Sequence, residues 1–129
     1  MKMTGTVVRG KQLGRTIGFP TANIRPDKPG ARFGENGVYI AWIRVETYPK
    51  RMRCMLNQGS HPTAPEGAPT IEAHILDFYD DIYGLRVEIE PLAFTRPETR
   101  FPTLDALKVR LARDLEETRA YFAASADQV

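Results

Sequence analysis

Short runs of alternating or clustered apolar residues, separated by Gly, Pro, Asn and Asp, make up most of the first two thirds of the chain. Runs of this length and composition are typical of β-strands. Residues 38–46 (VYIAWIRVE) are nearly continuous in hydrophobicity, as in a central barrel strand, whereas residues 50–57 alternate, with Arg51 and Arg53 facing out. We expect further strands at 3–8, 21–24, 70–76 and 85–90.

After residue 102 the pattern changes to that of one amphipathic helix. Apolar residues recur at spacings of three and four, and charged residues fill the rest of the wheel. Thr103 can cap the N-terminus of this helix, which we expect to end near Phe122, with residues 123–129 frayed. The apolar positions that should cover the rest of the fold are Leu104, Leu107, Leu111 and Leu115.

Six short strands followed by one helix predict a mainly β fold, a six-stranded antiparallel barrel with a C-terminal amphipathic helix. Closing the sheet fully would leave no strand edge exposed. The 129 residues are enough for one domain with a substantial core and leave little room for a second. We therefore expect a single domain over residues 1–129.

Composition and charge narrow the function classes. The net charge is only +2, so there is no basic field of the kind that attracts nucleic acid. The sequence lacks an apolar run of about eighteen residues that could span a membrane, and residues 1–10 lack the apolar core of a secretory signal. Cys54, the single cysteine, stands in an apolar strand and should be buried and unpaired. These features favour a cytoplasmic protein without a membrane or nucleic-acid partner.

The stretch at residues 14–23, GRTIGFPTAN, combines two glycines with a proline and a short polar run. It predicts a loop that stiffens into a strand. If that strand is extended, Thr21 and Asn23 lie on one face, and two neutral oxygens suit a hard cation already carried by a phosphate. The same residue types also occur in an ordinary tight turn before an edge strand.

A near-match to the phosphate-binding P-loop precedes this stretch, at residues 5–11 (GTVVRGK). Gln12 stands where that motif needs Ser or Thr, and the interior positions look like a strand, so we reject it. The loop at 9–18 carries Lys11 and Arg15, and its amides and cations could form a flap over phosphates or simply an exposed basic loop.

The strand at 70–76 has an unusual outer face. Its inner face is apolar, which leaves Glu72 and His74 together on the opposite side. Two solvated side chains are the ordinary interpretation of such a pair. An acidic turn, DFYDD at 77–81, follows the strand.

Several of these segments together resemble the riboflavin kinase family, whose members phosphorylate riboflavin to FMN with ATP and magnesium. The order and spacing of the segments carry the resemblance, which extends from Gly5 to about Phe122. The family fold, a six-stranded Greek-key barrel with a C-terminal helix, agrees with the hydrophobic pattern. The segments are GTVVRG, GRTIGFPTAN, GVYIAW at 37–42, EAHILD at 72–77, DIYG at 81–84, TRPETRF at 95–101 and the helix.

The resemblance implies a role for each matching residue. Glu72 would be the catalytic base, taking the proton of the terminal ribityl hydroxyl of riboflavin, and Thr21 and Asn23 would bind Mg²⁺ and the phosphates of ATP. The products would be FMN and ADP. Further residues at the ATP site would be Gly10, Arg15, Ile75, Asp77 and Tyr83. A flap that closes on the flavin would include Arg96, Thr99 and Phe101.

The chain departs from the family pattern around residues 57–63, where Gln58 replaces a usual aliphatic residue and His61 a usual arginine. Bacterial members usually carry an N-terminal FMN adenylyltransferase half, which this chain lacks, so we expect either an excised domain whose adenylyltransferase partner is missing or a stand-alone kinase. Two other functions have to be weighed, a non-catalytic flavin- or FMN-binding module and a barrel that binds single-stranded nucleic acid. The second needs aromatics among its basic residues, and none is expected on the Arg51/Arg53 face.

Overall fold

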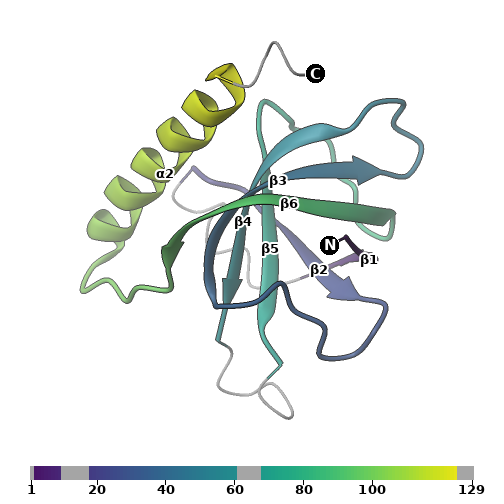
Figure 1. Ribbon diagram of the computed structural model, residues 1–129, viewed down its shortest axis with the longest axis horizontal. Helices are drawn as coiled ribbons and strands as arrows, with labels where there is room; N and C mark the ends of the chain where they lie inside the picture. The colour runs from purple at the N-terminus through teal and green to yellow at the C-terminus, as the bar shows by residue number, and fades with distance from the viewer. Residues whose placement is uncertain (1, 10–17, 61–67, 125–129) are drawn as a thin grey trace.

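The computed structural model describes residues 2–9, 18–60 and 68–124, and it forms a barrel of six strands with a helix along one side (Figure 1). Two residues that the resemblance places over ATP, Gly10 and Arg15, lie outside the described residues. The elements in chain order are β1 (Met3–Val8), β2 (Ala22–Pro26), β3 (Gly37–Val45), β4 (Met52–Gly59), β5 (Thr70–Ile75), β6 (Arg86–Pro97) and α2 (Leu104–Ala124).

The sheet is closed, and all neighbouring strands are antiparallel, in the order β1-β2-β5-β4-β3-β6. Strands β3, β4 and β5 are consecutive neighbours, and β6 returns to lie beside β3, which is the Greek-key arrangement. Pairing of β1 with β6 closes the barrel and confirms the predicted fold class. The six expected strands are all present.

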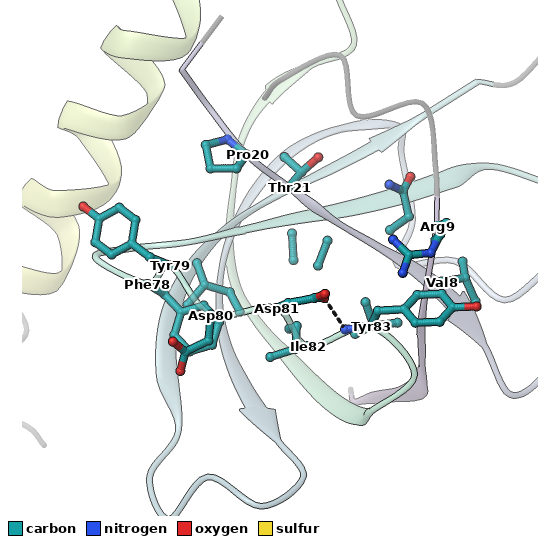
Figure 2. A pocket seen from close by; sticks show the side chains of 15 residues that line it. Val8, Arg9, Pro20, Thr21, Phe78, Tyr79, Asp80, Asp81, Ile82 and Tyr83 are labelled. Carbon is teal, nitrogen blue, oxygen red and sulfur yellow. Dashed lines mark hydrogen bonds between the residues drawn. The ribbon is translucent and has the colours of Figure 1, made fainter. Parts of the chain in front are cut away.

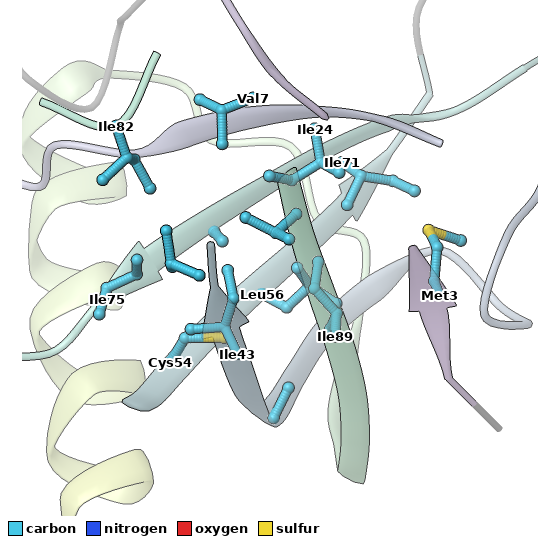
Figure 3. Packing of buried hydrophobic residues seen from close by; sticks show 14 of the residues in the cluster. Met3, Val7, Ile24, Ile43, Cys54, Leu56, Ile71, Ile75, Ile82 and Ile89 are labelled. Atoms are coloured by element: carbon cyan, nitrogen blue, oxygen red, sulfur yellow. The ribbon is translucent and has the colours of Figure 1, made fainter. Parts of the chain in front are cut away.

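The barrel interior is filled by the inward-facing residues of every strand, as the period of two requires (Figure 3). Ile43, Leu56 and Ile89 are fully buried near its centre. Cys54 is among them, and burial raises the pKa of its thiol to about 12, so it behaves as a small apolar side chain. The predicted role of Cys54 as a buried, unpaired residue is confirmed.

Helix α2 begins where predicted, because the Thr103 hydroxyl accepts a 3.1 Å hydrogen bond from the backbone N–H of Ala106. Its buried face differs from the prediction: the fully buried residues are Asp114, Thr118 and Phe122, whereas Leu104 is exposed. The leucine positions alone did not predict the buried face of the helix, because the charged side chain of Asp114 and the hydroxyl of Thr118 are also buried against the barrel.

Two strand ends differ from the prediction, and both bear on the site. Strand β4 continues through Gln58 and Gly59, beyond the alternating run at 50–57. Strand β6 continues to Pro97, beyond the strand expected at 85–90, so Arg96, which the resemblance places in a flap, stands in a strand. The hydrophobic alternation ends before these residues, and the pairing of β6 with β3 extends the strand. Of the helices that the structure describes, none has the length and apolar character that a membrane span needs.

Candidate active site

Thr21, Asn23 and Glu72 meet where β2 runs beside β5. Asn23 lies directly opposite Glu72 in the antiparallel register, so both side chains are on the outer face of the barrel. The Thr21 hydroxyl donates a 3.0 Å hydrogen bond to Oε1 of Glu72, which is half-buried. The three polar groups that the resemblance assigns to one site are therefore adjacent in the fold.

A fourth polar residue, Asn57 of β4, lies opposite Glu72 on its other side. Asn23, Glu72 and Asn57 thus form a row across three neighbouring strands, all on the outer face. Asn57 is not among the site residues predicted from the sequence. The strand register is the signal that identifies it, because a residue directly opposite an outward-facing glutamate must also face out.

A cleft of about 440 Å³ opens beside Thr21 and Asn23. Figure 2 shows Pro20 and Thr21 on one side of this cleft and residues 80–83 on the other. Glu72 stands at its edge, joined to the lining through the Thr21 hydroxyl. Of the residues that the resemblance places at the ATP site, those that line the cleft are Thr21, Asn23, Ile75 and Tyr83.

Arg9 brings a positive charge to this cleft. It directly follows β1, and its guanidinium carbon lies 4.1 Å from the centroid of the Tyr83 ring, within cation–π range. Both residues line the cleft (Figure 2). The cations predicted for the site, Lys11 and Arg15, come later in the loop, and Arg9 was not among them. Its place at the end of a strand that borders the cleft makes it a fitting contact for an anionic ligand.

Asp77 lies outside the cleft lining and joins the loop after β5 to helix α2. Its two carboxylate oxygens accept hydrogen bonds of 3.0 and 2.9 Å from the guanidinium of Arg119. These hydrogen bonds lower the pKa of Asp77 below its ordinary value. The backbone of Asp77 has a φ of 55°, in the left-handed region that Asp tolerates better than most residues. Its implied place in the ATP site stays a prediction.

The other two carboxylates of the acidic turn are also engaged. Asp80 accepts a 2.7 Å hydrogen bond from the hydroxyl of Tyr48, and this bond raises the pKa of the Tyr48 phenol. Asp81 accepts a 2.9 Å hydrogen bond from the backbone N–H of Tyr83 (Figure 2). Because all three aspartates hold neighbouring groups, the turn forms an anchored wall of the cleft.

Arg96, Thr99 and Phe101, the residues that the resemblance places around the flavin, lie between β6 and α2. The Arg96 guanidinium donates hydrogen bonds of 2.9 and 2.7 Å to the fully buried carboxylate of Asp114 and stands 5.7 Å from the Phe101 ring centroid. Arg110 donates a further 3.0 Å hydrogen bond to Asp114. Thr99 is exposed and bonds a nearby backbone carbonyl. Among the hydrogen bonds of the described residues, none joins this group to Glu72.

Gln58, a departure from the family pattern, is fully buried and fully hydrogen-bonded. Its side-chain oxygen accepts a 2.8 Å bond from the N–H of Phe33, and its nitrogen donates to the Gly34 carbonyl and the Asn36 side chain at 3.0 and 3.1 Å. It therefore fixes the turn before β3. The structural role of Gln58 was not predicted from the sequence, because the hydrogen-bond partners of a buried amide cannot be inferred from residue spacing.

The site offers oxygen ligands to a metal. Thr21 and Asn23 contribute neutral oxygens and Glu72 a carboxylate, and hard oxygen donors of this kind suit Mg²⁺. Within residues 2–9, 18–60 and 68–124, no three His, Cys, Asp or Glu side chains gather as a metal site. This donor set fits an ion that retains several water or phosphate ligands better than one enclosed by protein.

The Arg51/Arg53 face does carry aromatic rings, contrary to the expectation. The Arg51 guanidinium lies 4.0 Å from the Trp42 ring centroid, and Arg53 lies 5.6 Å from that of Phe122. Trp42 is next to Arg53 in the register of β3 with β4, and Phe122 arrives from α2. Phe122 is buried and Trp42 half-buried, so the two rings pack against each other and beneath the arginine side chains.

Known proteins resemble this chain both in sequence and in fold. The family model for riboflavin kinases, or flavokinases, matches residues 1–122. The chain belongs to the riboflavin kinase family. Its relatives include the bifunctional riboflavin kinase/FMN adenylyltransferase of Listeria monocytogenes, which is 42% identical over an alignment of 122 residues; the alignment covers 92% of this chain and 37% of the relative.

Solved structures of similar fold include riboflavin kinase from Trypanosoma brucei, with 30% identity and a TM-score of 0.71 over 95% of this chain and 79% of that one. A macrolide-efflux protein from Streptococcus pneumoniae has 34% identity and a TM-score of 0.80 over 92% of this chain and 38% of that one. The riboflavin kinase fold thus occurs both as most of one protein and as a smaller part of another. The chain spans 37% and 38% of the length of two bifunctional relatives that it matches.

Proposed function

We propose that this chain transfers the γ-phosphate of ATP to the terminal ribityl hydroxyl of riboflavin, giving FMN and ADP. Membership of the riboflavin kinase family supports the reaction class. The observation that carries the assignment of roles is the hydrogen bond of 3.0 Å between Thr21 and Glu72, with Asn23 opposite Glu72, at the edge of the cleft. A carboxylate with acceptor sites to spare and a cleft of about 440 Å³ stand side by side there.

In this proposal Glu72 accepts the proton of the ribityl hydroxyl while the hydroxyl oxygen bonds to the γ-phosphorus and the bridging oxygen leaves with ADP. The transition state of phosphoryl transfer is loose, so alignment of the two substrates matters more than a strong base. A carboxylate with one fixed hydrogen bond is oriented and retains acceptor sites for the incoming hydroxyl. Arg9 would balance part of the phosphate charge.

Thr21 and Asn23 would hold a magnesium ion together with the phosphates of ATP. When bound, such an ion neutralises charge on the phosphate oxygens. Because the two neutral oxygens of Thr21 and Asn23 would bind the ion, the carboxylate of Glu72 would remain available to accept the proton of the riboflavin hydroxyl. Asp81 and Tyr83 would form the opposite wall, where the hydrogen bond between them keeps the wall in place. Because ATP and riboflavin are both cytoplasmic metabolites, we place the reaction in the cytoplasm.

The bifunctional relatives bear two activities in their names, and the chain matches just over a third of their length. We assign this chain to the kinase portion. FMN adenylyltransferase activity would then belong to the remaining length of those relatives. A preparation of this chain should form FMN without converting it to FAD.

The direct test is to incubate the protein with riboflavin, ATP and magnesium and to separate the flavins by chromatography. FMN should accumulate in proportion to enzyme, and tight flavin binding without FMN would overturn the proposal in favour of a non-catalytic flavin-binding module. Glu72→Gln should lower kcat by about 10²–10⁴ while ligand binding is retained. Glu88→Gln is the matched control, since Glu88 is an outer-face glutamate of β6 that pairs with Lys2. Equal activity of both variants would reject Glu72 as the base.

A further inference from the structure

His74 shares the outer face of β5 with Glu72, and the roles proposed above leave it unused. Its Nδ1 lies 2.7 Å from the backbone carbonyl oxygen of Pro20, a hydrogen bond in which the ring nitrogen must be the donor because a carbonyl only accepts. The Phe19 ring lies against the imidazole, with 6.0 Å between the ring centroids. His74 therefore contacts the residue immediately before Thr21.

The chain at this point has few other means of attachment. The ladder between β2 and β5 consists of two pairs, Ala22 with Ala73 and Asn23 with Glu72. The next pair would set Thr21 against His74, but the register stops before it. Pro20 cannot extend a ladder, since it has no backbone N–H to donate. The stretch that carries Thr21 thus leaves the sheet just where its hydroxyl has to reach Glu72.

Side chains replace the missing ladder. Glu72 holds the Thr21 hydroxyl, and His74, two residues further along the same face, holds the Pro20 carbonyl. The two contacts are on adjacent residues of the incoming chain and on alternate residues of β5. Together they fix both the position and the direction of the backbone at Thr21.

We propose that His74 is a positioning residue for phosphoryl transfer: by holding the Pro20 carbonyl it sets Thr21 between the nucleotide cleft and Glu72. This rests on the proposed kinase function of the same site. His74 acts through the backbone and neither accepts nor donates the transferred proton. Loss of its donor should therefore weaken productive binding of ATP and magnesium and lower kcat, and it should leave the KM for riboflavin nearly unchanged.

The test compares two substitutions of nearly equal shape. Asn presents an N–H near the position of Nδ1, whereas Asp presents only an acceptor, which faces the Pro20 carbonyl unfavourably. His74→Asn should stay within about threefold of wild type. His74→Asp should raise the KM for ATP and lower kcat by about five- to tenfold each, the effect expected for one hydrogen bond lost and an unpaired group left. His74→Leu, which removes the donor without adding a charge, should resemble His74→Asp.

Thr70→Val is the control, because Thr70 is on the same face of β5 and its hydroxyl donates a hydrogen bond to the Gly59 carbonyl, away from Pro20 and Thr21. It should change neither constant. Equal kinetics for the Asn and Asp variants, or a riboflavin KM that rises as much as the ATP KM, would overturn the positioning role. Failure of the kinase proposal is separate, since in that case the wild-type protein makes no FMN. If His74→Leu does not fold, the Asn and Asp pair still decides.

Discussion

Replacing Asp114 with alanine should be one of the most destabilising single changes in this protein. The Asp114 side chain has no exposed surface, and it pairs with Arg96, whose side chain is 13% exposed, and with Arg110, which is 24% exposed. Alanine would leave two largely buried guanidinium groups without their carboxylate. Removing one partner of a buried ion pair costs about 3–5 kcal/mol, mostly because the remaining charge is left uncompensated.

The lower end of that range applies here, because both arginines reach some solvent and Arg110 can turn toward Glu117, 3.9 Å away. With about 2.1 cal/mol/K of unfolding entropy per residue, a chain of 129 residues has an unfolding entropy of about 0.27 kcal/mol/K. A loss of about 3 kcal/mol should then lower Tm by about 11 °C. This loss of stability arises from the uncompensated charges of the two arginines and not from the smaller volume of alanine.

Thermal unfolding followed by far-UV circular dichroism measures this shift. Glu117→Ala is the control, since its carboxylate is well exposed and should contribute less than about 1 kcal/mol. The double variant Arg96→Met, Asp114→Leu removes the carboxylate together with one of its two arginines. Arg110 remains but can turn toward Glu117, so this variant should recover part of the lost stability. A Tm within about 3 °C of wild type for Asp114→Ala, or no recovery in the double variant, would refute the reasoning.

Three further predictions follow from other contacts. Gln58→Leu should lower the free energy of unfolding by about 1–3 kcal/mol, because the Phe33 N–H loses its buried acceptor. Asn57→Ala, at the neighbouring outward-facing position, is the control. Equal urea-unfolding midpoints for the two variants would contradict the prediction. Arg119→Ala should raise the KM for ATP, because it releases Asp77, and should leave Tm within about 3 °C of wild type, because the ion pair is exposed. Arg113→Ala is the control and should change neither quantity. Equal ATP kinetics in the two variants would contradict the role of Arg119 in holding Asp77. Asp27 should contribute to acid stability: hydrogen bonds from Arg86 and Thr4 lower its pKa from 3.8 to about 2, so its stabilisation is present above about pH 4 and is lost as the pH falls toward 2. Asp27→Asn should therefore show a smaller loss of stability than wild type over that interval, and parallel acid-unfolding curves would show that the pairing contributes nothing.

The barrel could be predicted from sequence because its signals are local. Alternation with a period of two assigns inward and outward faces, so Glu72 and His74 were placed on the outer face of their strand without a structure. The helix start followed from Thr103 in the same way. Strand ends that depend on a partner were not visible: β6 reaches Pro97 because β3 pairs with it, although the hydrophobic pattern has already ended.

The site was only partly accessible to the same reasoning. Thr21 and Glu72 are joined over a separation of 51 residues, and it was the family resemblance, not spacing, that suggested they belong together. Asn57 became visible only through the strand register, and Arg9 only through its contact with Tyr83. The polar pairs of the helix, Arg96 with Asp114 and Arg119 with Asp77, were missed because charged residues on a helical wheel are normally assigned to solvent.

The pairing of Met3 with Ile89 that closes the barrel has a consequence for how the chain acquires its structure. These two residues are separated by most of the chain, and contacts between distant residues form slowly, because a long loop must be ordered before they can form. At roughly 5–20 residues per second, a ribosome needs about 4–17 s to synthesise the sequence that separates β1 from β6. During that interval β1 can pair with β2 alone, and its other edge stays open. The last step of assembly therefore waits for β6, and only then does the first strand of the chain become an interior strand.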